Sequence, residues 1–355
     1  MKTQHPAIRV CFLPGRESTY ARSRVLLKGL REAGLIVHDC SSSKKGFLRY
    51  FSAIGKFITF KSDSDIIFVG FFGQGLLPIV RLWTRRKIIF DTYVSAYQTL
   101  AFDRKTISPK GLGAALVRLV EKLSCRLADV CLLDTEQHIE YFVREYNLDR
   151  RQFHRSFVGA ERFDATHSSI ETLDPPVIHF HGEFQALHGV KFIVGAAKLL
   201  PQIKFRMIGS GRELDQCVSY CRTLKADNVE FMPSVPFEVL QKYIQQATIC
   251  LGIFGDTQKT QLVIPIKVYE ALAAGKPVIT SNTPAVRELL TDGKDVFLCN
   301  VADSEHLAWA IRKLLADNDL RKTIAANGHQ TFLEKCTPKM IGQEIAHLCE
   351  EILRH

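Results

Sequence analysis

The sequence predicts an α/β protein of two domains, each with a mostly parallel sheet covered by helices. Its 355 residues suffice for two domains of ordinary size. Short β-branched and aromatic runs alternate with longer helical stretches, and a polar, turn-rich segment from Thr166 to Pro176 interrupts the alternation near the middle. We therefore expect a first domain over residues 1–165, a second over 172–337, and a C-terminal helix over 338–355 that packs back on the first.

The first domain alternates strands with helical segments such as Ser23 to Ala33, which Gly34 ends, and Leu112 to Leu127. Two parallel strands joined through a helix need a crossover, so this order favours a parallel sheet with right-handed connections. The expected strands are Ile8 to Leu13, Leu35 to Asp39, Asp65 to Val69, Lys87 to Asp91, Val130 to Asp134 and His154 to Val158.

The same alternation starts again after the turn-rich segment, which we interpret as a linker. From Ser304 onward the pattern is helical, and its last segment runs from Pro338 to Leu353. The expected strands of the second domain are Val177 to Phe180, Lys204 to Ile208, Val229 to Met232, Thr248 to Ile253, Pro277 to Thr280 and Val296 to Cys299.

Composition narrows the class of protein. With 46% hydrophobic and 24% charged residues, the chain is neither disordered nor fibrous. No apolar run is long enough to span a bilayer, and the opening MKTQHPAIRV lacks the apolar core of a secretory signal, so we expect a cytoplasmic protein. The ten cysteines are scattered and none forms a Cys-x-x-Cys pair, which favours buried, reduced thiols and predicts neither a disulfide framework nor a bound metal.

The net charge of +10 is unevenly distributed. Residues 1–165 carry 27 basic and 16 acidic side chains, a net charge of +11, whereas residues 166–355 carry 20 and 21, a net charge of −1. This asymmetry predicts that the first domain meets an anionic surface or substrate, although a merely solubilising surface would give the same count.

The segment from Gly252 to Leu290 carries the clearest chemistry. It joins a strand end to a loop, a helix that begins near Pro265, and a turn into another strand. In an open α/β sheet, ligands bind where strand ends meet helix starts, and a helix N-terminus suits a phosphate. Lys259 and Lys267 could balance that phosphate and Glu270 could accept ribose hydroxyls; the alternatives are a solvated lysine face and a dipole partner of the helix.

Three stretches of the second domain resemble a known family. IPIKVYEALAAGKPVI is similar to the donor-site signature of GT-B glycosyltransferases of the retaining family-4 type, also described as glycosyl transferases group 1, and VIHFHGEFQALHGV and FRMIGSGRE precede it in the same order. The resemblance implies two facing Rossmann-like domains and a nucleotide-sugar donor bound mainly by the second domain.

The resemblance also implies roles for single residues. Glu270 would hold the nucleotide ribose, and Lys267 with Lys259 would face the diphosphate. Glycines would line the donor site, with Gly15 closing over the donor from the first domain; they are Gly15, Gly182, Gly209 and Gly211.

Two departures from the family pattern concern the diphosphate. The position eight residues before Glu270 holds Leu262, where the family has a second glutamate. The Arg and Lys pair at the start of the second domain is absent, and the stretch reads Gly182-Glu183-Phe184 followed by His188-Gly189. Lys259 and Lys267 would then supply the missing charge.

The first domain offers one candidate catalytic residue, Asp91, at the end of a predicted strand. It could contact a sugar or acceptor hydroxyl, or it could cap the following turn. Related enzymes often have a histidine here, whereas this chain has none between His38 and His138, and a lone histidine on the predicted helix Glu136 to Arg144 is more often structural.

The stretch from Lys44 to Lys61 contains five basic residues and no acid. Wound as a helix, it gathers apolar side chains such as Phe51 and Phe57 on one face. This pattern is typical of an interfacial helix on anionic lipid, and equally of a crossover helix that packs on its own sheet. The cations expected at a membrane or acceptor face are Lys44, Lys45, Arg49 and Lys56.

Together with the resemblance, which implies retention and metal independence, these observations predict a hexosyltransferase that uses a nucleotide-sugar as substrate and needs no cofactor. Its acceptor would be a cell-envelope or polysaccharide-related glycan or a lipid-linked one, and the enzyme would lie at the inner face of the cell membrane as a peripheral protein. A sugar-nucleotide epimerase and a non-catalytic basic binding protein stay open as alternatives. The basic residues form no nucleic-acid-reading motif, so we expect no nucleic-acid partner. Phe12 to Glu17 lacks the Gly-x-Gly-x-x-Gly turn of a nicotinamide oxidoreductase.

Overall fold

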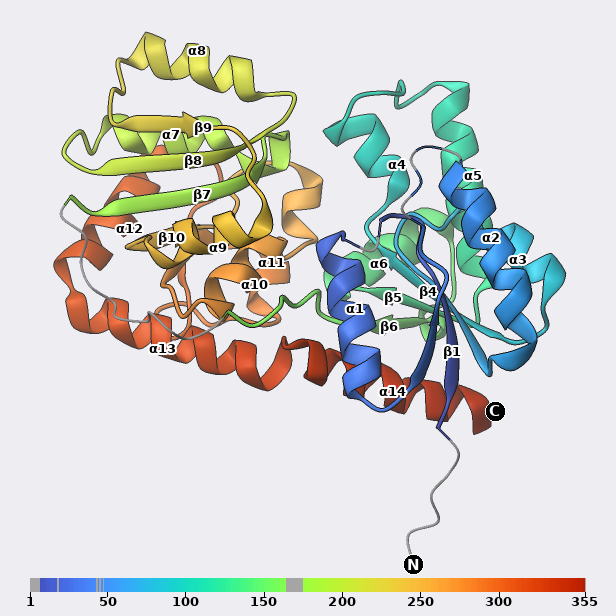
Figure 1. Cartoon of the computed structure of the whole chain (residues 1–355). Coiled ribbons are helices and arrows are strands. Elements are labelled where there is room, and N and C mark those ends of the chain that lie inside the picture. Colours follow the sequence, from blue (N-terminus) through green and yellow to red (C-terminus); the bar gives the residue numbers. More distant parts are fainter. Residues whose placement is uncertain are drawn as a thin grey trace, which may run out of the picture. The chain divides into compact units, whose positions relative to one another are not determined.

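The computed structural model describes residues 7–17, 19–42, 44, 46, 48–163 and 175–354. It divides into two compact units: unit 1 comprises residues 1–161 with 335–355, and unit 2 comprises residues 162–334. Most of the predicted linker therefore lies outside the described residues, as does Lys45. Each unit is an α/β fold around a six-stranded sheet of parallel strands, as the sequence predicts (Figure 1).

The sheet of unit 1 has the strand order β2-β1-β3-β4-β5-β6. Every strand predicted for the first domain is present, with ends that differ by up to three residues. A reversal of strand order falls between β1 and β3, which in open α/β sheets creates a crevice at the carboxyl ends of the strands. The strands are β1 (Arg9–Leu13), β2 (Ile36–Asp39), β3 (Ile66–Val69), β4 (Lys87–Tyr93), β5 (Val130–Leu133) and β6 (Phe153–Arg155).

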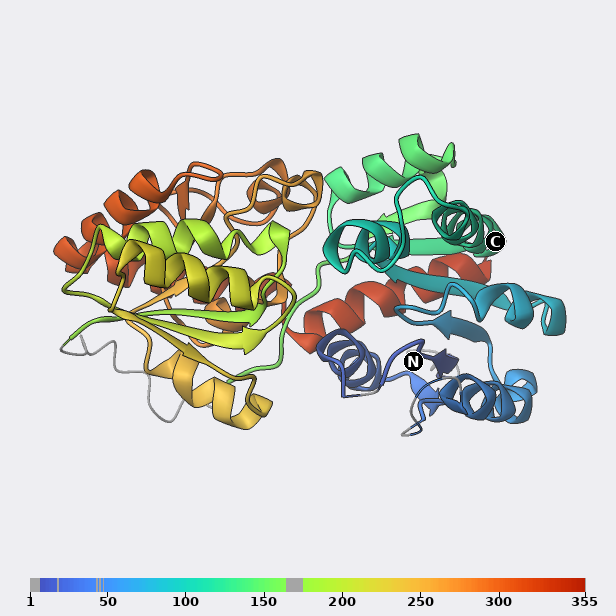
Figure 2. The same ribbon diagram turned by 90° about the horizontal axis from the view of Figure 1, so that it is seen from above.

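Helices cover both faces of this sheet. On one face, α1 (Ala21–Glu32) lies beside the C-terminal helix α14 (Pro338–Arg354), as predicted, over a core that both share (Figures 1 and 2). Their close approach needs glycine, because a Cβ at Gly342 would lie 1.9 Å from the carbonyl oxygen of Gly29. Right-handed crossovers place the other helices on the opposite face: α2 (Leu48–Phe60), α3 (Leu77–Trp83), α5 (Leu112–Leu127) and α6 (Glu136–Tyr146), with the short α4 (Ala96–Gln98) before α5.

The sheet of unit 2 has the order β12-β11-β10-β7-β8-β9, in which the chain reverses direction between β7 and β10. This is the strand order of a dinucleotide-binding Rossmann fold, whose ligands bind at the carboxyl ends of the strands beside that reversal. All strands predicted for the second domain are present: β7 (Val177–Glu183), β8 (Lys204–Ser210), β9 (Val229–Met232), β10 (Ile249–Leu251), β11 (Val278–Ser281) and β12 (Phe297–Cys299).

The main core of unit 2 lies between its sheet and the helices α7, α8 and α12, and α10 packs on β10 and β11. The helices of this unit are α7 (Val190–Lys198), α8 (Leu214–Leu224), α9 (Phe237–Gln245), α10 (Ile266–Ala273), α11 (Pro284–Arg287), α12 (Ser304–Ala316) and α13 (Asn318–Lys335). All ten cysteines are buried and free. Across the described residues, no helix combines the length and apolar character that a membrane span requires.

Candidate functional site

The reversal between β7 and β10 brings together the charged residues that the sequence singles out in unit 2. Helix α10 begins directly after Pro265 and follows the loop from β10. Lys267 and Glu270 lie three residues apart, so they project from the same side of the helix, and each is only 6% exposed. Both therefore lie buried beside the carboxyl end of β7.

Glu270 is held by a histidine of β7. The Nε2 atom of His181 lies 2.7 Å from Oε2 of Glu270, and Nδ1 of His181 lies 3.1 Å from Nε2 of His179. With His181 donating to the Glu270 carboxylate, its Nδ1 accepts from the Nε2–H of His179. Burial lowers the pKa of His179 well below its ordinary value, so this residue is neutral and donates from one nitrogen only. The two histidines fix the orientation of the carboxylate.

Lys267 is the most perturbed cation of this site. Its ammonium lies 4.8 Å from the centre of the Phe180 ring. Burial lowers the pKa of Lys267 from 10.5 to about 7, although the carboxylates of Glu270 and Glu183 act in the opposite direction. A buried lysine whose charge is unstable in the empty site is a strong candidate for binding an anion.

Glycines bring β7 and β8 together at this edge of the sheet. A Cβ at Gly209, which has a φ of 152°, would lie 1.9 Å from the carbonyl oxygen of Gly182. At Gly182 itself a Cβ would lie 3.1 Å from Nζ of Lys267. Gly211 packs in the same way on the backbone of Phe184. The three predicted glycines thus line one edge, and side chains there would displace the lysine or separate the strands.

A third histidine and a second lysine lie close to Lys267. His188 is buried, and its Nδ1 forms a hydrogen bond with the carbonyl oxygen of Glu183. Burial, followed by the positive charges of Lys267 and Lys259, lowers the pKa of His188 well below its ordinary value. Lys259 lies in the 3₁₀ turn Gln258–Gln261, which follows β10. The structure therefore brings Lys259, Lys267, Glu270 and Gly182 to one edge of unit 2.

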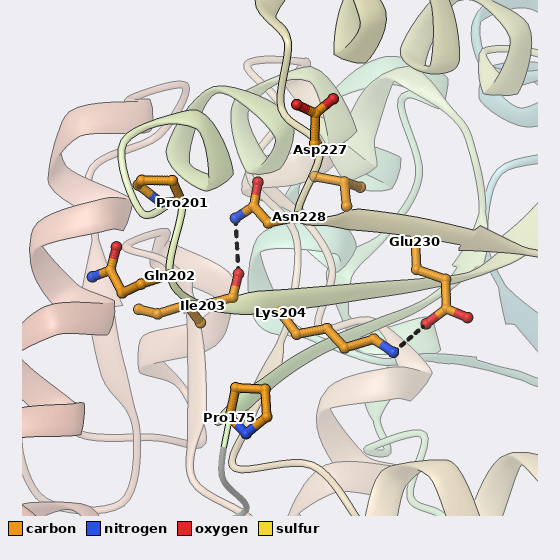
Figure 3. Close-up of a pocket in the computed structure, with 9 residues that line it drawn as sticks. Pro175, Pro201, Gln202, Ile203, Lys204, Asp227, Asn228 and Glu230 are labelled. Atoms are coloured by element: carbon orange, nitrogen blue, oxygen red, sulfur yellow. Dashed lines mark hydrogen bonds and ion pairs between the residues drawn. The ribbon is translucent and has the colours of Figure 1, made fainter.

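Two hollows of unit 2 are lined by other residues. One, of about 380 Å³, is at the amino ends of β8 and β9, where Lys204 pairs with Glu230 and Asn228 donates to the carbonyl oxygen of Ile203 (Figure 3). The other, of about 580 Å³, lies near the first turns of α7, α8 and α12. Neither is lined by Lys267 or Glu270.

In unit 1, Gly15 lies in the loop after β1, beside the reversal between β1 and β3. A Cβ there would lie 2.1 Å from the carbonyl carbon of Phe72 in the loop after β3. The residue is thus needed for the close approach of two loops at the carboxyl edge of this sheet. Its predicted contact with the donor stays a prediction.

Asp91 has a partner that sequence reasoning missed. Arg22 of α1 donates to the Asp91 carboxylate at 2.9 Å and to the carbonyl oxygen of Phe157 at 2.8 Å, and both charged side chains are almost completely buried. This buried ion pair belongs to neither of the two roles that the sequence suggested for Asp91. A contact between Asp91 and a sugar hydroxyl stays a prediction.

His138 is fully buried in α6, with Nδ1 2.7 Å from Oδ1 of Asp134. This agrees with the structural interpretation of a lone helical histidine. The sequence did not indicate that Arg22 pairs with Asp91 or that His181 pairs with Glu270, because the two partners of each pair lie far apart along the chain. Only His179 and His181, at alternate positions of β7, suggested that this strand carries polar side chains to one face.

Helix α2 fits its sheet through Ala53 and Phe57, as a crossover helix does, whereas Phe51 on the expected apolar face is exposed. Two of its cations have partners within unit 1. Arg49 pairs with Glu17 at 2.6 Å, and Lys56 donates to the carbonyl oxygen of Ser41 at 2.7 Å. The net positive charge of the surface around α2 is thus lower than the sequence of the helix indicates, because Glu17, from the segment after β1, neutralises Arg49. Lys44 is exposed.

The two Rossmann-like units define the GT-B class of fold. Solved structures agree: the chain superposes on sucrose-phosphate synthase from Thermosynechococcus elongatus with a TM-score of 0.75 at 17% identity, covering 98% of this chain and 100% of that one. Anabaena HepE in complex with UDP-glucose gives a TM-score of 0.72 at 14% identity, over 97% and 100%. At these identities the likeness concerns the fold.

Sequence comparison confirms the family resemblance. Residues 163–331, which make up most of unit 2, match the family described as glycosyl transferases group 1. The lipopolysaccharide core biosynthesis glycosyltransferase LpsE of Rhizobium meliloti is 24% identical over 50% of this chain and 51% of its own length. Alpha-D-kanosaminyltransferase of Streptomyces kanamyceticus is 21% identical over 73% and 68%. The chain spans about half the length of curated relatives such as LpsE.

Proposed function

We propose that this chain is a glycosyltransferase that moves a sugar from a nucleoside-diphosphate sugar to a glycan or lipid-linked acceptor. The observation that carries the proposal is the convergence of Lys267, Glu270 and Gly182 at the strand-order reversal of unit 2, inside the segment that matches the family. Complexes of HepE with UDP and with UDP-glucose support this class of donor, and the name of LpsE supports a polysaccharide-related acceptor.

In this proposal each residue has a separate task. Oε2 of Glu270 is held by His181, and we assign the ribose hydroxyls to its other oxygen. Lys267 and Lys259 face the diphosphate and replace the family's Arg and Lys pair. Two ammonium groups and the first turn of α10 together stabilise the leaving diphosphate without a bound metal.

The proposed reaction retains configuration at the anomeric carbon. The bond from that carbon to the diphosphate oxygen breaks, and the acceptor oxygen forms the new bond on the same face of the sugar. The acceptor's hydroxyl proton passes to the leaving diphosphate oxygen, which Lys267 stabilises as its negative charge develops. The route needs no protein nucleophile. We place the reaction in the cytoplasm, with the basic unit 1 receiving the acceptor at an anionic membrane surface.

Calorimetric titration with UDP, GDP, ADP and their sugar conjugates tests the donor site. We expect one preferred nucleotide, and a loss of about 1–3 kcal/mol of its binding free energy in Glu270→Ala because one carboxylate hydrogen-bond partner is removed. The matched control is Glu230→Ala at the opposite edge of the same sheet, which should bind normally. Equal affinities for both variants would refute the assignment of Glu270.

Incubation of the preferred sugar nucleotide with and without acceptors separates the alternatives. We expect release of the nucleoside diphosphate to depend on an acceptor and to survive a chelator. Conversion of the sugar nucleotide without any acceptor would instead identify an epimerase. Absence of binding to every nucleotide would favour the non-catalytic basic binding protein.

A further inference from the structure

Helix α5 of unit 1 turns its leucines outward. Leu112, Leu116, Leu119 and Leu123 are 92%, 61%, 62% and 42% exposed. Their spacing of four, three and four residues places them on one side of the helix, and we call this side the leucine face. A row of exposed leucines of this length marks an interaction surface.

The orientation of α5 is fixed by polar contacts on its inner side. The buried carboxylate of Glu121 accepts hydrogen bonds from Ser95 Oγ at 2.8 Å, from the Ala96 backbone N–H at 2.6 Å and from Tyr146 OH at 2.5 Å. Ser124 Oγ donates to the carbonyl oxygen of Gln74 at 2.8 Å. A rotation that buried the leucines would break all of these bonds, so their exposure belongs to the native fold.

The neighbouring helix α3 packs against α5 and adds apolar surface. Leu82 is 84% exposed, and Ile79 and Trp83 are also exposed. Tryptophan is enriched where a protein crosses from water into lipid, because its ring is amphipathic. Exposed apolar side chains therefore lie on two adjoining helices, and the Lys61 ammonium lies 5.5 Å from the centre of the Trp83 ring.

The charges around this surface identify the occupant. From Arg104 to Ala128 the sequence contains six cations and one acid, the buried Glu121; Asp103 and Asp129 flank this stretch, and Arg118 pairs with Glu145. From Leu77 to Lys87 it contains four cations and no acid, although Arg81 and Lys87 form ion pairs with Asp129. A second copy of the chain would bring these cations against one another. A bilayer with anionic headgroups offers both an apolar interior for the leucines and negative charge for the cations.

We propose that the leucine face, together with Leu82 and Trp83, inserts into the interfacial layer of a bilayer that contains anionic lipid. The exposed Lys110, Arg126 and Arg85 contact the headgroups. This inference rests on the proposed function in one respect, namely that the acceptor lies at a membrane. The donor site belongs to unit 2, so nucleotide binding in solution does not depend on it.

Co-sedimentation with vesicles of phosphatidylglycerol and phosphatidylcholine tests the proposal. The double variant Leu116→Gln, Leu119→Gln should bind about 100-fold more weakly, since each exposed leucine contributes about tenfold. Leu123→Gln is a third test on α5, and Leu353→Gln is its matched control. Both leucines are 42% exposed, but Leu353 lies on α14, which covers the opposite face of the sheet. Only the α5 variant should lose affinity. Vesicles of phosphatidylcholine alone should bind at least about tenfold more weakly.

Trp83 supplies an independent readout. Trp309 of unit 2 is the other tryptophan, so in a Trp309→Phe background anionic vesicles should shift the Trp83 emission to shorter wavelength, and brominated lipids should quench it. Absence of wild-type vesicle binding, or unchanged binding by the double variant, would overturn the proposal. A double variant that loses a dimer without losing lipid affinity would assign the face to a second copy. Nucleotide calorimetry on the same variants shows whether the donor site survives independently.

Discussion

The protonation of Lys267 should couple nucleotide binding to pH. In the empty site, burial holds the pKa of this lysine at about 7, so the residue is mostly neutral above that pH. A bound diphosphate favours the charged form and returns the pKa toward 10.5. We therefore expect binding to take up a proton above pH 7 and affinity to fall as the pH rises.

The magnitude follows from linkage. For a free-site pKa of about 7 and a bound-site pKa near 10.5, uptake is about half a proton at pH 7 and about 0.9 proton at pH 8. Affinity should fall about 50-fold between pH 7 and pH 9, which corresponds to about 2.3 kcal/mol. The phosphate's own titration lies near pH 6 and contributes little in this window. His188 is buried and neutral there, because its pKa is lowered well below its ordinary value.

Calorimetry of UDP binding at pH 7, 8 and 9, in buffers of different ionisation enthalpy, measures both affinity and proton uptake. Lys267→Met should bind weakly with no proton uptake. The matched control is Lys276→Met, because Lys276 is equally buried in unit 2 but lies after the C-terminal end of α10. This control should keep the pH dependence. Wild-type affinity that is equal at pH 7 and pH 9, with no proton taken up, would refute the reasoning.

Further predictions concern the supporting contacts. His181→Phe should reduce the binding free energy of UDP and of uridine equally, by about 1 kcal/mol, because the Glu270 carboxylate loses the hydrogen bond that orients it. A calorimetric loss of affinity for UDP alone would contradict this. Asp91→Asn should lower the free energy of unfolding, measured in urea, by about 3–5 kcal/mol, because it leaves the buried Arg22 charge without a partner. The double variant Arg22→Met, Asp91→Leu, which removes both charges, should be nearly as stable as the wild type. Unchanged stability of Asp91→Asn together with lost activity would instead support a catalytic aspartate. Gly209→Ala should destabilise by about 2 kcal/mol or more in the same assay, whereas Gly55→Ala, with open space around it, should not.

The central strands, such as β1, β3 and β10, were predictable because they are buried on both faces of parallel sheets. Such strands are continuous apolar runs bounded by turns, which a single sequence shows directly. The ends were less certain: β7 continues to Glu183, beyond the predicted end at Phe180, because its polar residues pair with Gly209 and Ser210 of β8. Register with a distant strand, and not local composition, sets that limit.

The site was predictable only in part for a related reason. Lys267 and Glu270 lie three residues apart on one helix, so local spacing indicates that they act together. The bond from His181 to Glu270 joins residues 89 apart, and the bond from Arg22 to Asp91 joins residues 69 apart. A carboxylate in a sequence does not reveal whether a distant arginine neutralises it. For that reason Asp91 resembles a catalytic residue in the sequence and forms a buried ion pair in the structure.

Helix α5 is a case in which hydrophobic periodicity predicts the wrong side of a helix to be buried. Hydrophobic periodicity would turn Leu112, Leu116 and Leu119 toward the sheet. The structure instead buries Glu121, since its carboxylate satisfies the otherwise unpaired N–H at the start of α4 and two hydroxyl groups. Leaving those donors unsatisfied would cost more than exposing leucines that a bilayer can cover. A row of leucines kept outward by a buried carboxylate is the observation on which the proposed contact with lipid rests.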